Sequence, residues 1–97
     1  MVNKYLKELK EIVLDSLKTE DVKIFIFGSR ARNDNSPASD VDIGLIPKNS
    51  LDPIKLSMLK EKIGDSNIPY KVEIVNFNDV SEEFKKEAMK NTEIWKD

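Results

Sequence analysis

An apolar run that stops at a Gly-Ser pair is the feature that most constrains how this chain folds. Residues Ile24 to Phe27 are all apolar, and Gly28 and Ser29 follow them directly. A strand that is apolar on both faces is typical of the centre of a sheet, where other elements cover both sides. We therefore expect residues 22–27 to form a central strand that ends at Gly28.

A second strand is expected at residues 41–46, and it carries a pair of carboxylates. Asp40 and Asp42 flank Val41. Side chains two positions apart on a strand point to the same face, so the two carboxylates lie together on one surface. Such a pair is costly without a positive charge between its members, and Mg²⁺ prefers oxygen ligands and bridges carboxylates to phosphates. This pattern predicts a metal site on the second strand.

The residues around the Gly-Ser pair predict the phosphate half of the same site. Gly28 has no side chain, so its backbone can approach a ligand closely. Ser29 and the amides after it can donate hydrogen bonds to phosphate oxygens, in particular if Ser29 opens a short helix. Arg30 and Arg32 add positive charge, and the turn-forming run at residues 33–37 is typical of an exposed loop.

Together these motifs resemble the minimal nucleotidyltransferases of the DNA polymerase beta superfamily. The family pattern is an apolar residue with Gly-Ser, then Asp-apolar-Asp, then a third carboxylate on a later strand, which Glu73 matches. The opening GSRARN at residues 28–33 is similar to the family's GSRARG. The resemblance implies an α/β (α+β) fold, the polymerase beta-type nucleotidyltransferase palm. Its small mixed sheet with helices would follow the order α-β-α-β-α-β-α.

The resemblance also implies a role for each of these residues. Gly28 and Ser29 would hold the β- and γ-phosphates of a nucleoside triphosphate. Asp40, Asp42 and Glu73 would be the catalytic carboxylates and would ligate two Mg²⁺ ions. The family commonly has Asp as the third carboxylate. Glu73 is longer by one methylene, which changes the geometry with which it could bind a metal ion.

The remaining segments predict a simple set of covering elements. Apolar residues spaced three and four apart indicate an amphipathic helix at residues 4–18. Asp52 and Pro53 are typical of a helix start, and Gly64 of its end. Alternating residues predict a third strand at residues 70–77, and a last helix is expected to run from the acidic residues after Asn78 toward Trp95.

Composition limits the chemistry and the class of protein. The chain of 97 residues has the length of one small domain, and we expect residues 1–97 to form a single nucleotidyltransferase domain. A net charge of −2 argues against a general nucleic-acid binder. With no Cys and no His there is no thiolate or imidazole ligand. Neither a signal-peptide core nor a membrane span is evident, so we expect a cytoplasmic protein that does not bind membranes.

Two functions from different classes are compatible with these residues. The resemblance is strongest to MntA-like antitoxins of HEPN/MNT toxin-antitoxin systems. It implies Mg²⁺-dependent transfer of AMP from ATP, or of another nucleotide, to a hydroxyl, with a tyrosine of a helical HEPN-domain toxin as acceptor. The alternative is a protein of the same fold that neutralises its partner by binding, with little or no turnover. Homo- or hetero-oligomers are compatible with both functions. A third hypothesis is a nucleotidyltransferase that acts on a small molecule.

Each site residue also has an ordinary structural interpretation. Asp40 and Asp42 by themselves are typical of a solvated strand face, as Glu73 is. Arg30 and Arg32 are equally compatible with ordinary surface charge. Only the combination of Gly-Ser and the carboxylate strand at this spacing favours a nucleotide site.

Overall fold

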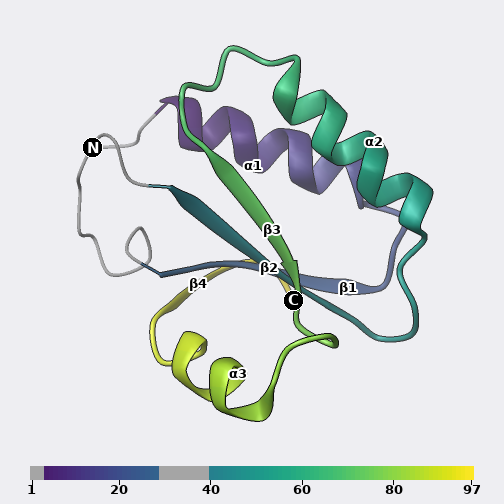
Figure 1. The fold of residues 1–97 in the computed structure, drawn as a ribbon. Helices are drawn as coiled ribbons and strands as arrows, with labels where there is room; N and C mark the ends of the chain where they lie inside the picture. Colours follow the sequence, from purple (N-terminus) through teal and green to yellow (C-terminus); the bar gives the residue numbers. More distant parts are fainter. Residues whose placement is uncertain (1–3, 29–39) are drawn as a thin grey trace.

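The computed structural model describes residues 4–28 and 40–97, which form a four-stranded mixed sheet with helices on both faces (Figure 1). The sheet order is β3-β2-β1-β4. β1 is antiparallel to both of its neighbours, whereas β2 and β3 are parallel. The strands are β1 (Val22–Phe27), β2 (Val41–Pro47), β3 (Val72–Asn76) and β4 (Thr92–Lys96). The mixed α/β fold predicted from the sequence is confirmed.

β1 lies in the middle of the sheet, as its apolar run predicts. Five of its six residues are buried, and the sixth, Lys23, is half-buried. Ile24 and Ile26 pack into the core on one face of the sheet, while Phe25 and Phe27 pack into a separate cluster on the other. The two-residue period of the strand thus supplies both cores from one segment.

Two helices, α1 (Lys4–Ser16) and α2 (Pro53–Gly64), lie side by side over one face of the sheet (Figure 1). The predicted helix start is confirmed, because the Asp52 side chain accepts a hydrogen bond from the Ile54 amide at 2.9 Å and Pro53 occupies the first turn. Gly64 remains helical, and Asp65 caps the helix in an ordinary right-handed conformation. The core under these helices contains Leu9, Val13, Leu17, Ile24, Ile26, Val41, Ile43, Leu45 and Leu59.

The short helix α3 (Glu82–Ala88) covers the opposite face (Figure 1). Ser81 caps it by accepting a hydrogen bond from the Phe84 amide at 3.1 Å. Beneath it Phe25, Phe27 and Phe77 form an aromatic cluster with ring centroids 5.0 to 6.1 Å apart. α3 therefore closes a small second core on the face that also carries Asp42.

The prediction of a last helix running toward Trp95 is wrong beyond Ala88. The chain turns and forms β4, which pairs with β1 and leaves Trp95 packed against the core under α1 and α2. Thr92, Ile94 and Trp95 favour a strand by propensity, and the second edge of β1 supplies the partner that a single segment cannot reveal. Lys96 fixes the end of this strand, since its Nζ donates to the carbonyl oxygens of Leu17 and Glu20.

The third strand is shorter than predicted, beginning at Val72 and ending at Asn76. The described elements follow the order α1, β1, β2, α2, β3, α3, β4, and the helix expected between the first two strands falls on residues 29–39, outside the described residues. None of the helices in the described part of the chain has the length and apolar character needed to cross a membrane.

Candidate active site

The three predicted carboxylates lie at the same end of the sheet. Asp42 lies in β2, directly opposite Glu73 of β3 in the parallel register, and Asp40 immediately precedes β2. On its other side Asp42 is the antiparallel partner of Phe27. Residues opposite each other on neighbouring strands share a face, so Asp42 and Glu73 lie on the α3 side of the sheet, with Phe25 and Phe27.

Gly28 lies against the carboxylate of Asp42. Its φ is +80°, a backbone conformation that favours glycine. A Cβ atom at this position would lie 2.7 Å from Oδ2 of Asp42, closer than side chains tolerate. The backbone angle favours glycine at this position, and a side chain here would also force the Asp42 carboxylate to turn away from the main chain.

The carboxylates repel one another in the absence of a cation. Asp42 is half-buried, whereas Asp40 and Glu73 are exposed. Burial raises the pKa of Asp42 above its ordinary value, and the charges of Glu73 and Asp40 raise this pKa further. This end of the sheet therefore carries concentrated negative charge that a bound cation would offset.

The donor set fits a hard divalent cation. Asp40, Asp42 and Glu73 offer only carboxylate oxygens, which are the ligands that Mg²⁺ prefers. Within residues 4–28 and 40–97, no three acidic side chains already converge on a common point as a closed metal centre would require.

The other predicted phosphate ligands, Ser29, Arg30 and Arg32, lie outside the described residues. Among the residues predicted to bind phosphate, the structure therefore describes Gly28 and its close approach to Asp42. A hollow of about 160 Å³ opens beside Gly28, between the end of β1 and the end of α3. It is lined by Phe27, Gly28, Glu87, Ala88 and Asn91.

Sequence reasoning did not single out the residues that border this site from the C-terminal part of the chain. Glu87 and Asn91 reach Gly28 because α3 returns along the sheet and β4 then begins beside Phe27. Lys71 directly precedes β3, and the parallel register continued by one residue places it opposite Asp40. Its spacing of two from Glu73 was the available signal. Glu87 and Asn91 were missed because the sequence predicted one continuous helix toward Trp95, which would not bring them back to β1.

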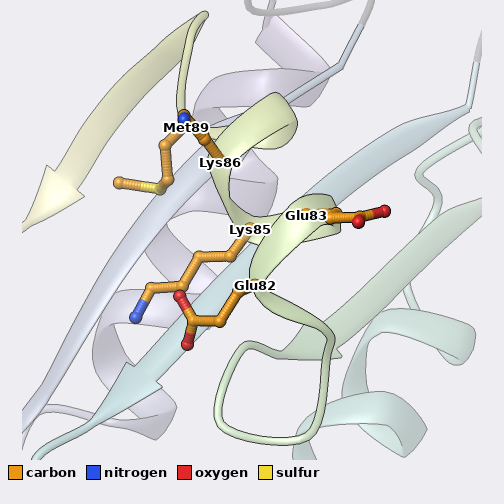
Figure 2. Close-up of a pocket in the computed structure, with 5 residues that line it drawn as sticks. All are labelled: Glu82, Glu83, Lys85, Lys86 and Met89. Carbon is orange, nitrogen blue, oxygen red and sulfur yellow. The ribbon is translucent and has the colours of Figure 1, made fainter.

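A larger hollow of about 520 Å³ lies along α3 itself (Figure 2). Asp40, Asp42 and Glu73 do not line it. Figure 2 shows Glu82 and Lys85 extending to the same side of the helix, with Glu83 directed away from them. The hollow is lined by Glu82, Glu83, Lys85, Lys86 and Met89. It is a shallow surface feature, whereas the carboxylate pair, Gly28 and the smaller hollow adjoin one another.

Comparison with known proteins shows which family and fold the chain is similar to. Residues 4–97 match the family described as Polymerase beta, Nucleotidyltransferase. A Haemophilus influenzae protein named "Probable protein adenylyltransferase MntA" is 31% identical over 65 residues, which cover 67% of this chain and 57% of that protein. The matched part of the chain thus spans little more than half the length of this curated relative.

Solved structures share the fold at low sequence identity. A toxin-antitoxin complex with AMP-PNP superposes with a TM-score of 0.68 at 20% identity, covering 89% of this chain and 71% of that one. A complex of tri-AMPylated Shewanella oneidensis HEPN toxin with MNT antitoxin gives a TM-score of 0.63 at 18% identity, covering 92% and 70%. These similarities establish the arrangement of helices and strands.

Proposed function

The chain belongs to the polymerase beta nucleotidyltransferase family, and from this premise we propose that it transfers AMP from ATP to a hydroxyl of a partner protein, with Mg²⁺ as cofactor. The observation that carries the proposal is the position of Asp42. Its carboxylate lies between Gly28 on the β1 side and Glu73 on the β3 side, with Asp40 two residues away. This arrangement supports a site in which Gly28 would adjoin the phosphates and Asp40, Asp42 and Glu73 would hold the metal ions.

At the α-phosphorus the reaction forms one bond and breaks one, and the acceptor hydroxyl loses its proton. The acceptor oxygen attacks the α-phosphorus of ATP, the bond between the α-phosphorus and the bridging oxygen to the β-phosphate breaks, and pyrophosphate leaves. The acceptor proton leaves to water. Divalent ions, two in our proposal, would neutralise charge on the entering and leaving oxygens when bound.

The chain's own residues would divide the work as follows. Gly28 lets the main chain approach the leaving phosphates, and Ser29, Arg30 and Arg32 would donate hydrogen bonds to them. Asp40 and Asp42 would hold the ions. Glu73, beside Asp42, would hold the ion on the acceptor side.

We further propose that the acceptor is a tyrosine of a HEPN-domain toxin and that the chain acts as an antitoxin. The curated relative is named a protein adenylyltransferase, and similar folds occur in complexes of MNT antitoxins with HEPN toxins, one of them tri-AMPylated. The described fold presents its carboxylates on an open face, which suits an acceptor as large as a protein.

The test is incubation with α-labelled ATP and Mg²⁺, with and without a HEPN-domain protein as candidate acceptor, followed by intact-mass analysis of both chains. We expect the partner to gain AMP, and we expect Asp42→Asn to abolish the gain while keeping the circular dichroism spectrum of the wild type. An unchanged labelling rate in Asp42→Asn would contradict the assigned site.

The same variant separates the enzyme from a protein that neutralises by binding. If Asp42→Asn still neutralises the toxin in cells while transferring nothing, neutralisation occurs by occlusion. Loss of both activities with retained complex formation supports the enzyme. The Asp79→Asn variant, exposed and remote from Gly28 in the sequence, serves as the control for a lost carboxylate.

A further inference from the structure

Lys71 lies at the same end of the sheet as the carboxylates. It directly precedes β3, and its carbonyl oxygen accepts a hydrogen bond from the Val41 amide at 2.9 Å. The parallel register pairs Val41 with Val72 and Asp42 with Glu73. Continued by one residue, this register places Lys71 opposite Asp40.

The alternation of β3 places Lys71 on the carboxylate face. Val72 and Ile74 pack against the core under α1 and α2, so Glu73 is directed to the other face. Lys71 is two residues from Glu73 and therefore shares its face. The side chain is exposed, and the ion pairs found among residues 4–28 and 40–97 do not include it.

The position of Gly28 decides which reactant Lys71 would meet. Gly28 follows β1, Asp42 belongs to β2, and Lys71 directly precedes β3, which is an edge strand. Phosphoryl transfer places the attacking and leaving oxygens roughly in line. If pyrophosphate leaves on the Gly28 side, the acceptor enters on the β3 side, where Lys71 lies.

We propose that Lys71 is a contact for the acceptor: its ammonium donates a hydrogen bond to the attacking hydroxyl oxygen and stabilises the transferred phosphoryl group as the oxygen–phosphorus bond forms. This inference rests on the proposed nucleotidyl transfer and assigns the edge of β3 to the acceptor. Lys71 neither accepts the proton nor touches the leaving pyrophosphate, so bond making and breaking are as written above.

Two other roles for Lys71 make different predictions. A lysine that only offsets the negative charge of Asp40 and Glu73 would affect stability and not the acceptor. A lysine that binds the triphosphate would be needed for ATP binding in the absence of any acceptor. Measuring nucleotide affinity and acceptor kinetics separately distinguishes all three.

The experiment compares wild type with Lys71→Met, Lys71→Arg and the control Lys60→Met, an exposed lysine of α2 on the opposite face of the sheet (Figure 1). For each protein, kcat/KM for the HEPN-domain acceptor is measured at saturating ATP and Mg²⁺. The Kd of a fluorescent ATP analogue is measured without acceptor, and thermal unfolding is followed by circular dichroism.

We expect Lys71→Met to lower kcat/KM for the acceptor about 10- to 100-fold, the usual effect of a lost hydrogen bond from a charged donor. The Kd of the ATP analogue should stay within about twofold, because the lost contact is on the acceptor side. Lys71→Arg should recover most of the rate, and Lys60→Met should behave as wild type.

Wild-type kinetics in Lys71→Met would overturn the inference, as would a loss of rate matched by an equal loss of ATP affinity. A change in unfolding temperature without a change in kcat/KM would assign Lys71 to charge balance instead. If the wild type transfers no AMP at all, the proposed function fails, and the Lys71 inference fails with it. If instead wild type and Lys71→Met transfer AMP equally well, only the Lys71 inference fails and the proposed function stands.

Discussion

At the scale of single residues, the three glycines of the chain occupy three different surroundings. Gly28 combines a positive φ with the Asp42 carboxylate beside it, whereas a Cβ atom at Gly64 would meet nothing within 4 Å. The backbone and the neighbouring Asp42 therefore favour glycine at position 28. At Gly64, in the last turn of α2, packing leaves room for a side chain.

We predict that Gly28→Ala lowers the free energy of unfolding by about 1–3 kcal/mol, the range for a residue held in a disfavoured backbone region. It should also reduce AMP transfer, since the main chain and Asp42 must move apart. Gly64→Ala should instead be neutral or stabilising by up to about 1 kcal/mol, because alanine is the better helix former. Urea unfolding of both variants checks this, and equal effects would contradict the role given to Gly28.

At the scale of secondary-structure elements, β2 must bring Asp42 to the surface and still allow the aromatic cluster to pack beneath α3. Gly44 meets this need, because a Cβ atom there would collide with the ring of Phe25 and approach that of Phe77 to 2.8 Å. The rings of Phe25 and Phe77 pack edge to face, with centroids 5.0 Å apart, over the space that a side chain would fill.

We predict that Gly44→Ala lowers the free energy of unfolding by about 1–3 kcal/mol through overpacking. The β-propensity of alanine gives no comparable loss in a strand, so the size of the effect measures the ring collision. The double variant Gly44→Ala with Phe25→Leu should recover part of the loss, since the smaller side chain makes room. Additive losses in a double-mutant cycle would argue against direct contact between these positions.

At the scale of the whole molecule, the carboxylate cluster sets a pH dependence of stability. The pKa of Asp42 is raised in the folded protein above its ordinary value of 3.8, so the folded state binds this proton more tightly than the unfolded chain. The resulting contribution to stability is fully present below the unfolded pKa and is lost as the pH rises through the folded pKa. At neutral pH the ionised Asp42 therefore destabilises the fold.

We predict that Asp42→Asn unfolds at a higher temperature than wild type at pH 7 in the presence of a chelator. The difference should shrink as the pH falls through the folded pKa and below 3.8, where wild-type Asp42 is protonated in both states. Mg²⁺ should raise the unfolding temperature of the wild type more than that of Asp42→Asn, because a ligand that binds the folded state stabilises it. A variant less stable than wild type at pH 7 would contradict this account, and Asp79→Asn is the control.

Much of the site could be predicted from the sequence because its signals are local. The apolar run and Gly28 predicted the central strand, and the spacing of Asp40 and Asp42 placed both on one face. The Asp52-Pro53 cap predicted where α2 begins. The Gly-Ser and Asp-apolar-Asp pattern also carried the family resemblance, which the match over residues 4–97 bears out.

Only the tertiary structure decided how the strands pair and which residues meet. It turned the last segment into β4 and set Glu73 opposite Asp42. It also placed Gly28 against the Asp42 carboxylate and Lys71 on the same face. Short-range periodicity fixes the direction of side chains within a strand, whereas register and strand order depend on contacts between segments far apart in the chain. The sequence by itself therefore determined the chemistry available to this protein, and long-range pairing decided where that chemistry is assembled.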